Sequence, residues 1–125
     1  MIFLFDKNLS PRLAKGLKAF GENVEHLDDH LPADTPDVNI LEYLYDHDMV
    51  LITRDKNIRR NDAEKGAIYK YKAGVFFLGG ANLDAWQIIE QVIRNWRRIK
   101  ELSLNTSRPF AFSIRSKGKE ITRII

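Results

Sequence analysis

The chain of 125 residues contains no cysteine. It therefore forms no disulfide, no thiolate zinc site and no cysteine nucleophile, and this composition fits a cytoplasmic protein. Long apolar runs are also missing, because no stretch approaches the roughly 20 residues that a membrane-spanning helix requires. The N-terminus lacks the basic and then apolar pattern of a signal peptide. We therefore expect a cytoplasmic protein with no membrane partner.

Glycine and proline are scarce, with 7 and 4 residues, and no repeat, linker or low-complexity tract is present. Hydrophobic residues make up 44% of the chain and charged residues 30%, which is typical of a globular protein and not of a disordered one. A chain of this length is ordinary for a single domain with one core. The sequence thus predicts one domain over residues 1–125.

Basic residues are few in the first part of the chain and abundant in the second. Residues 1–53 contain four Lys/Arg and ten Asp/Glu, whereas residues 54–125 contain sixteen Lys/Arg and seven Asp/Glu. Such a division indicates a polyanionic partner for the second part, with the acidic residues used elsewhere. Solvated helix faces are the alternative explanation for the same charges.

Apolar runs and cap residues predict strands that alternate with helices. Strands are expected at residues 2–5, 24–27, 49–53, 74–78, 109–114 and 120–125. Helices are expected after Ser10, from Thr35–Pro36, from about Asp62, and after Asn82 or Asp84, while the polar residues 54–61 are expected to form a loop. This alternation predicts an α/β/α sandwich around a mainly parallel, Rossmann-like sheet, closed by an antiparallel hairpin.

Two helices show apolar residues at helical spacing, and these stripes are expected to face the core. The stripe on the first helix consists of Leu13, Leu17 and Phe20. The stripe on the last helix consists of Trp86, Ile89, Ile93, Trp96 and Ile99. Both tryptophans are therefore expected to be buried.

Three aspartates are expected to meet at one edge of the sheet. Asp6 and Asp55 each follow a predicted strand, and Asp37 lies at the start of a predicted helix. The carboxyl ends of parallel strands and the N-termini of the following helices share one edge, where ligands bind. Three carboxylates gathered there repel one another unless a cation lies between them. Hard oxygen ligands of this kind suit Mg²⁺ or Mn²⁺.

Three polar residues are placed to support this site. Asn8 has a carbonyl oxygen that can ligate an ion, and Thr53 can orient Asp55 or hydrogen-bond an oxyanion. Asn57 follows Asp55 in the same loop. The alternative is that these side chains only satisfy backbone donors in loops, as Asp and Asn often do. Asp34 is a rival for the role given to Asp37, because both flank the same helix start.

At three places the sequence resembles short PIN-like proteins of bacteria and archaea. FDKNLS at residues 5–10 is similar to their opening motif, in which an acid and an amide flank one residue and precede Leu-Ser. DVNIL at residues 37–41 resembles their acidic helix start, and VLITRDKNI at residues 50–58 resembles their strand-Thr-x-Asp segment. The order and spacing agree over residues 1–78, while the remaining helix and hairpin agree only in general shape.

This resemblance implies a metal-dependent ribonuclease on a Rossmann-like sandwich, and many such proteins are toxins of toxin–antitoxin pairs. It implies that Asp6, Asp37 and Asp55 are the acidic metal ligands and catalytic residues. The sequence departs from the family pattern at Asn57, where a second acid is usual. Asp62 or Glu64 is available to compensate for that missing carboxylate.

RNA contacts are expected from the basic residues that directly follow the third acidic motif, namely Lys56, Arg59 and Arg60. The basic residues between Arg94 and Lys100 are expected to lie on a solvent-exposed helix face. RNA, a cognate antitoxin and a second copy of the chain are therefore the expected partners. Two other functions stay open: a catalytically silent PIN-like protein that binds RNA or a partner, and a receiver- or flavodoxin-like signalling module.

Overall fold

Strands and helices alternate along the chain as the patterning predicts. The computed structural model describes the backbone of residues 1–125 and every side chain except that of Arg59. The strands are β1 (Ile2–Phe5), β2 (Val24–His26), β3 (Met49–Thr53), β4 (Gly74–Leu78), β5 (Phe110–Ile114) and β6 (Ile121–Arg123). The helices are α1 (Pro11–Ala19), α2 (Asp37–His47), α3 (Lys56–Arg60), α4 (Asp62–Lys70) and α5 (Ala85–Asn105), with a 3₁₀ turn, η1, at Leu27–Asp29.

One six-stranded sheet has the order β2-β1-β3-β4-β5-β6. The first five strands are parallel to their neighbours, and β6 pairs with β5 in the antiparallel direction, which confirms the predicted fold class. Strand order reverses between β1 and β3, because the chain leaves β1 toward β2 on one side and later crosses back to β3 on the other. In open sheets such a reversal opens a crevice at the carboxyl ends of the two strands.

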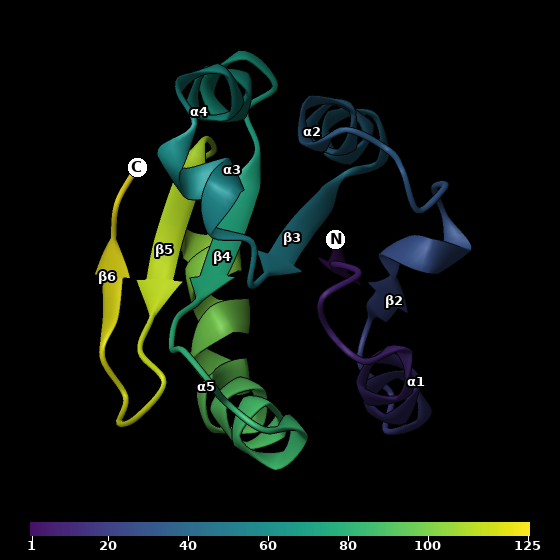
Figure 1. Ribbon diagram of the computed structural model, residues 1–125, viewed down its shortest axis with the longest axis vertical. Helices are drawn as coiled ribbons and strands as arrows, with labels where there is room; N and C mark the ends of the chain where they lie inside the picture. The colour runs from purple at the N-terminus through teal and green to yellow at the C-terminus, as the bar shows by residue number, and fades with distance from the viewer.

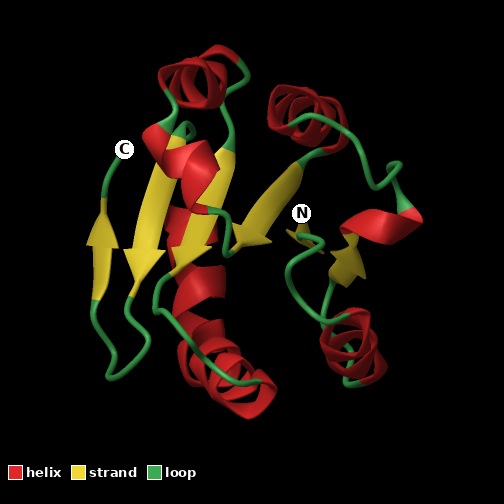
Figure 2. Ribbon diagram, in the orientation of Figure 1, coloured by secondary structure: helices red, strands yellow, loops and turns green.

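Helices cover both faces of the sheet (Figures 1 and 2). Helices α1 and α5 lie on one face, where Leu17 and Trp96 pack with apolar residues of β1 and β5. Helices α2, α3 and α4 lie on the other face, where Leu41, Ile58 and Ile68 join a second apolar cluster. The sheet is therefore buried on both sides, as its nearly uninterrupted apolar strands require.

Polar side chains fix where the helices begin. Ser10 caps α1 through its hydroxyl, which accepts from the amide of Arg12, and Pro11 takes the first helical position. Asp84 and Gln87 form a reciprocal capping box at the start of α5, which selects Asp84 over Asn82 as the cap. Helix α2 starts at Asp37, one residue later than expected, with Pro36 as a cap that offers no side-chain acceptor.

The prediction of a loop over residues 54–61 is wrong, because α3 occupies most of it. Asp55 is the N-cap of this short helix, and its Oδ1 accepts a hydrogen bond from the amide of Asn57 at 2.8 Å. Ile58 is fully buried in the core cluster beneath α2 and α4. The Asp55 cap and the buried Ile58 thus stabilise a single turn of helix, which the polar composition of this segment does not predict.

The prediction that the helix stripes are wholly buried is also wrong. Trp96 is buried and packs edge-on against the rings of Phe3 and Phe5. Trp86 is 72% exposed, Ile93 51% and Phe20 90%. At 100° per residue Trp86 lies about 80° around α5 from Trp96, so burial of one turns the other outward. No helix in the described chain is long and apolar enough to cross a bilayer.

Gly74 tests how tightly β4 and β5 are packed. A Cβ at this position would lie 2.5 Å from Cζ of Phe110, which is fully buried beside Phe76. We expect Gly74→Ala to lower the free energy of unfolding in urea by about 1–3 kcal/mol. The control is Gly66→Ala in α4, where a Cβ meets nothing within 4 Å. The free energy of unfolding of this variant should rise by up to about 1 kcal/mol because alanine has the higher helix propensity. Equal stabilities of the Gly74→Ala and Gly66→Ala variants would contradict the close packing of Gly74 against Phe110.

Candidate active site at the carboxyl edge of the sheet

Asp6 is a buried carboxylate at the end of β1. Its Oδ2 accepts a hydrogen bond of 2.6 Å from the hydroxyl of Thr53, and its Oδ1 accepts from the amide of Lys7 at 2.7 Å. The amide of Asp6 continues the parallel ladder by donating to the carbonyl of Ile52 at 3.0 Å. The β1–β3 pairing therefore delivers Asp6 to the crevice at the reversal of strand order.

Thr53 connects Asp6 to Asp55. The Thr53 hydroxyl is fully buried at the end of β3, donates to Asp6, and accepts from the amide of Asp55 at 2.9 Å. Thr53 is predicted to orient Asp55, and these two hydrogen bonds provide the contact for that role. Because the Asp55 carboxylate also caps α3 through Asn57, its direction is fixed by the backbone on both sides.

The two supporting asparagines are placed differently from the aspartates. Oδ1 of Asn8 accepts from the amide of Arg54 at 3.2 Å, so Asn8 ties the loop after β1 to the loop after β3. In this contact Asn8 satisfies a backbone donor in a loop, which is the alternative to a role as a metal ligand. The side chain of Asn57 is exposed, and its backbone amide makes the contact to Asp55.

Asp37 is half-buried and lies within electrostatic reach of the other two aspartates. Burial raises the pKa of Asp37, and the negative charges of Asp55 and Asp6 raise it further. Its rival Asp34 is exposed in the preceding turn. The first turn of α2 therefore brings Asp37, and not Asp34, to the edge where β1 and β3 end.

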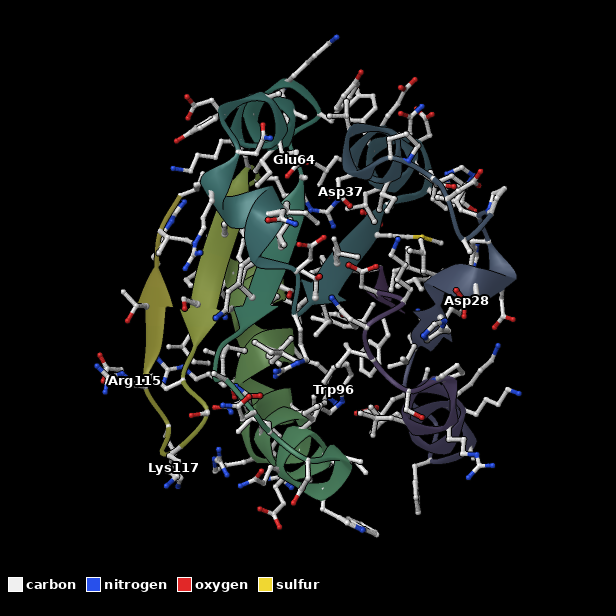
Figure 3. All side chains as sticks on the ribbon, viewed as in Figure 1. Asp28, Asp37, Glu64, Trp96, Arg115 and Lys117 are labelled. Carbon is white, nitrogen blue, oxygen red and sulfur yellow. The ribbon has the colours of Figure 1, made fainter. Side chains whose placement is uncertain are left out.

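Glu64 is a fourth carboxylate at this edge. It lies in the first turn of α4, and Figure 3 shows it in the same region as Asp37. Burial raises the pKa of Glu64, and the charge of Asp37 raises it further. The two carboxyl groups lie close enough to interact, and a hydrogen bond between them raises the pKa of Glu64 and lowers that of Asp37. Of the two residues named as compensating for Asn57, Glu64 joins the aspartates, whereas Asp62 is exposed at the start of α4.

The chemistry of these residues suits a hard divalent cation. All of the gathered donors are carboxylate oxygens, and Oε2 of Glu64 is buried with no hydrogen-bond partner. As they lie, no three Asp, Glu or His residues with described side chains form a group that could hold a metal ion. The raised pKa values of Asp37 and Glu64 favour their protonated forms, whereas an ion bound at this edge would favour their ionised forms.

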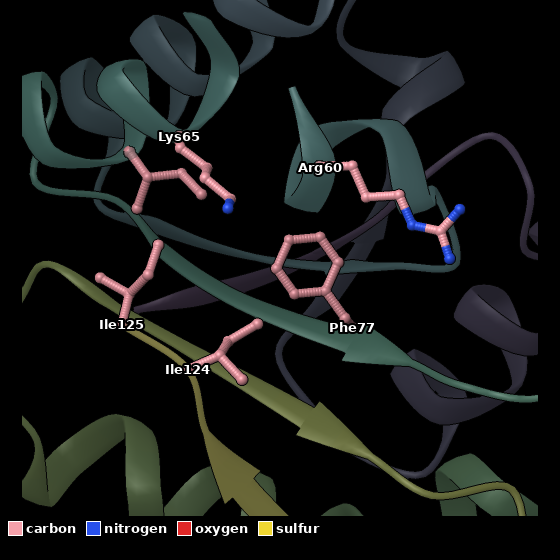
Figure 4. Close-up of a pocket in the computed structure, with 6 residues that line it drawn as sticks. Arg60, Lys65, Phe77, Ile124 and Ile125 are labelled. Carbon is pink, nitrogen blue, oxygen red and sulfur yellow. The ribbon is translucent and has the colours of Figure 1, made fainter. Parts of the chain in front are cut away.

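Basic residues border the acidic edge on the side of β4. Lys56 and Arg60 are exposed at the two ends of α3, and the side chain of Arg59, the third predicted RNA contact, lies outside the described residues. Arg60 and Lys65 line a pocket of about 490 Å³ (Figure 4). Phe77 of β4, the register partner of Thr53, also lines this pocket, so the pocket lies one strand from the acidic edge.

The basic residues of α5 have more than one use. Arg94 donates to the carbonyls of Ser116 and Gly118, which braces the hairpin between β5 and β6. Lys100 pairs with Glu22. Arg97 and Arg98 are exposed, as expected for a solvated face. The prediction of a solvent-exposed face is therefore confirmed for Arg94, Arg97 and Arg98, whereas Lys100 is only partly exposed.

The paired carboxyls generate a pH prediction. Raised pKa values mean that the folded protein binds more protons than the unfolded chain, so stability falls as pH rises through the folded pKa values. Glu64→Gln removes one charge and offers an amide donor to Asp37. In EDTA, the variant should melt at a higher temperature than the unsubstituted protein near pH 7, and this difference should vanish near pH 4.

Thermal unfolding followed by circular dichroism between about pH 4 and pH 8 measures this effect. Glu101→Gln, on α5 across the sheet, is the matched control and should follow the unsubstituted protein at every pH. A Glu64→Gln curve parallel to that control would show that the charges of Asp37 and Glu64 do not destabilise the fold.

The strand order alone does not identify a family, because receiver and flavodoxin-like proteins use β2-β1-β3-β4-β5 as well. A receiver carries paired acids after its first strand and a lysine after a later one, whereas here Asp6-Lys7-Asn8 follows β1 and Gly79-Gly80 follows β4. A family model described as a PIN like domain matches residues 1–80. No curated protein and no solved structure matches the chain. The match spans well over half of the 125 residues, so the chain belongs to the PIN-like domain family, whose fold is generally that of nucleases.

Proposed function

We propose that the protein is a metal-dependent endoribonuclease in which Asp6, Asp37 and Asp55 bind Mg²⁺ or Mn²⁺. The observation that carries this proposal is the gathering of these carboxylates with Glu64. Besides burial, the charges of Asp55 and Asp6 raise the pKa of Asp37, and those of Asp37 and Asp55 raise the pKa of Glu64. A fold gains nothing in stability from such crowding, so a bound cation is its simplest physical reason. Membership of a family with a generally nucleolytic fold gives independent support.

Within this proposal, the chain's own groups position the oxygen ligands. The Thr53 hydroxyl donates to the Asp6 carboxylate and accepts from the backbone amide of Asp55. The positions of the two aspartates relative to each other are therefore fixed. Asn8 supports this arrangement by joining the two loops through the amide of Arg54. Asn57 fixes the direction of Asp55 through its backbone amide. None of the three needs to touch the RNA.

Asp37 and Glu64 would both be ionised beside a bound cation, because its positive charge would lower their raised pKa values. The chemistry that Mg²⁺ or Mn²⁺ would supply is activation of a water for in-line attack on a phosphodiester, with neutralisation of charge on the leaving oxygen. The ionised Glu64 would be able to accept a proton from a neighbouring water, since its Oε2 has no hydrogen-bond partner in the described structure.

RNA approaches the site along the basic border on the β4 side. Lys56, Arg59 and Arg60 belong to α3, whose cap is Asp55 itself, so phosphates held there lie next to the acidic edge. The pocket between Arg60 and Lys65 is large enough for part of a nucleotide next to the cleaved bond. Acidic and basic residues are therefore divided between cation binding and phosphate binding, in line with the charge division of the sequence.

We propose that the protein is the toxin of a toxin–antitoxin pair, with an antitoxin as its protein partner and a homodimer as its assembly. This role follows from the family resemblance. A small adjacent gene for a DNA-binding protein would support it, and growth arrest on expression that this gene relieves would test it directly.

A catalytically silent PIN-like protein that binds RNA is the second candidate. Two observations favour it. Asn57 replaces an acid that is usual in the family motif, and no three acidic or histidine side chains in the described structure are arranged to hold an ion as they lie. Glu64 argues against it by supplying a carboxylate from α4 in place of the one missing at position 57.

Asp37→Asn tests the metal site with little change in side-chain volume. We expect at least a hundredfold loss of Mn²⁺-dependent cleavage of single-stranded RNA. The rise in melting temperature that Mn²⁺ gives the unsubstituted protein should also be lost, because a cation that binds only the folded state stabilises it. Gel assays of cleavage and thermal unfolding with and without Mn²⁺ give the two readouts.

Asp34→Asn is the matched control, because Asp34 is an exposed aspartate three residues before Asp37. This variant should cleave RNA and respond to Mn²⁺ like the unsubstituted protein. Stabilisation by Mn²⁺ without cleavage in the unsubstituted protein would favour the silent candidate. Equal behaviour of the two variants would remove Asp37 from the site.

The RNA path is tested by salt dependence. Lys56→Ala with Arg60→Ala should weaken RNA binding and reduce the slope of log affinity against log salt by about one to two, because each lost phosphate contact releases fewer counterions. Arg97→Ala with Arg98→Ala removes the same charge from the exposed face of α5 and should change the slope less. Filter binding over a salt series decides between them, and a larger effect from the α5 pair would move the RNA to the other face.

A further inference from the structure

An apolar groove lies between α1 and the first half of α5, on the opposite face of the sheet from the basic pocket. Its volume is about 920 Å³, and most of the side chains that line it are apolar. Helix α1 contributes Leu13, Leu17 and the neighbouring Phe20, and α5 contributes Trp86 and Ile93. Of these, Phe20, Trp86 and Ile93 are more than half exposed.

The groove concentrates exposed apolar surface that the fold does not use. The described side chains include seven large exposed hydrophobic residues, and three of them line this one groove. Contiguous exposed apolar patches often mark interaction sites, whereas single exposed apolar residues are normal on a protein surface. Helices α1 and α5 are tied together at one end, where Trp96 and Lys100 both bind Glu22.

The shape of the groove suits a helix. Helices α1 and α5 follow β1 and β4, which point the same way in the sheet, and both cover the same face of it (Figure 1). Side chains from Arg12 to Phe20, on and just after α1, line one side of the groove, and side chains between Ala85 and Ile93 of α5 line the other. A third helix laid between them buries its apolar stripe against both walls, as in other helix-in-groove complexes.

The charges beside the groove indicate the chemistry of the occupant. Helix α1 contains three basic residues, Arg12, Lys15 and Lys18, and no acidic residue, and Arg12 itself lines the groove. On α5, Glu90 and Arg97 flank Ile93 one turn before and one turn after, and their charges cancel. Arg12 therefore makes the α1 side of the groove basic, with Lys15 one turn further along, whereas Lys18 lies about 160° around α1 from Gly16 and faces away from the groove. Acidic side chains complement this basic rim.

We propose that this groove binds an acidic amphipathic helix of a partner protein. A second copy of the chain fits less well, because a symmetric contact through this face would bring Arg12 of one copy toward Arg12 of the other. This inference goes beyond RNA cleavage and holds whether or not the carboxyl edge is catalytic. The groove reaches Asn8, so an occupant also touches the loop that carries Asp6.

The probe is a synthetic helical peptide of about 14 residues, with leucines at i, i+3, i+4 and i+7 and glutamates beside them. Its twin has lysine in place of every glutamate. Binding is measured by anisotropy of the labelled peptides, and burial of Trp86 by a blue shift of indole emission. We expect the glutamate peptide to bind about tenfold more tightly than its twin, with an affinity that falls as salt rises.

Two pairs of variants locate the binding. Gly16 lies in the groove wall, and a Cβ there meets nothing within 4 Å, so Gly16→Leu fills the groove while favouring the helix. Its matched control is Gly66→Leu in α4, where space is also open. Gly16→Leu should abolish binding of the glutamate peptide, and Gly66→Leu should leave it unchanged. Arg12→Glu with Lys15→Glu should reverse the preference toward the lysine peptide.

Three results would overturn the proposal. One is equal binding of the two peptides, which would make the contact purely apolar. Another is the absence of binding by the glutamate peptide to the unsubstituted protein. The third is a dimer in sedimentation that Gly16→Leu dissociates and Gly66→Leu does not, which would assign the groove to a second copy of the chain.

Discussion

The Thr53 hydroxyl is the contact on which the acidic edge depends. It lies between β1 and β3, where strand order reverses, and it holds the Asp6 carboxylate and the Asp55 amide at once. Because Thr53 is fully buried, both of its hydrogen bonds are sheltered from competing water. The carboxylates thus keep their places despite mutual repulsion, and the loops, the cap of α3 and the approach to the site all follow from that fixed pair.

Elements defined by local signals were predictable from the sequence. β3 and β4 have the predicted bounds, and the Ser10 cap of α1 is where side-chain chemistry places it. The edge shared by Asp6, Asp37 and Asp55 followed from the topology of parallel sheets. Periodicity could not show how far each helix is rolled on the sheet, so Phe20 and Trp86 were wrongly assigned to the core. Helix α3 was missed because its only apolar residue is Ile58, too few for any period to appear.

Glu64 shows what local patterns omit. In the sequence it is one of several acids in a polar helix, and nothing in its spacing separates it from Asp62. Only the packing of α4 against the sheet turns Glu64 inward toward Asp37, while Asp62 at the helix start faces solvent. The same holds for the identity of the fold: strand order is shared by proteins of unrelated activity, and the side chains at the strand ends separate them.

The sheet ends in two very short strands, β2 and β6, of three residues each. β6 carries Arg123, and the turn before it carries Lys117 and Lys119, so an incoming strand would meet few free backbone groups and a row of positive charges. Extension of the sheet into a second chain is therefore disfavoured at both borders. Contacts with other macromolecules are left to the helical faces and the loop edge, and the groove between α1 and α5 and the acidic site meet at the loop after β1.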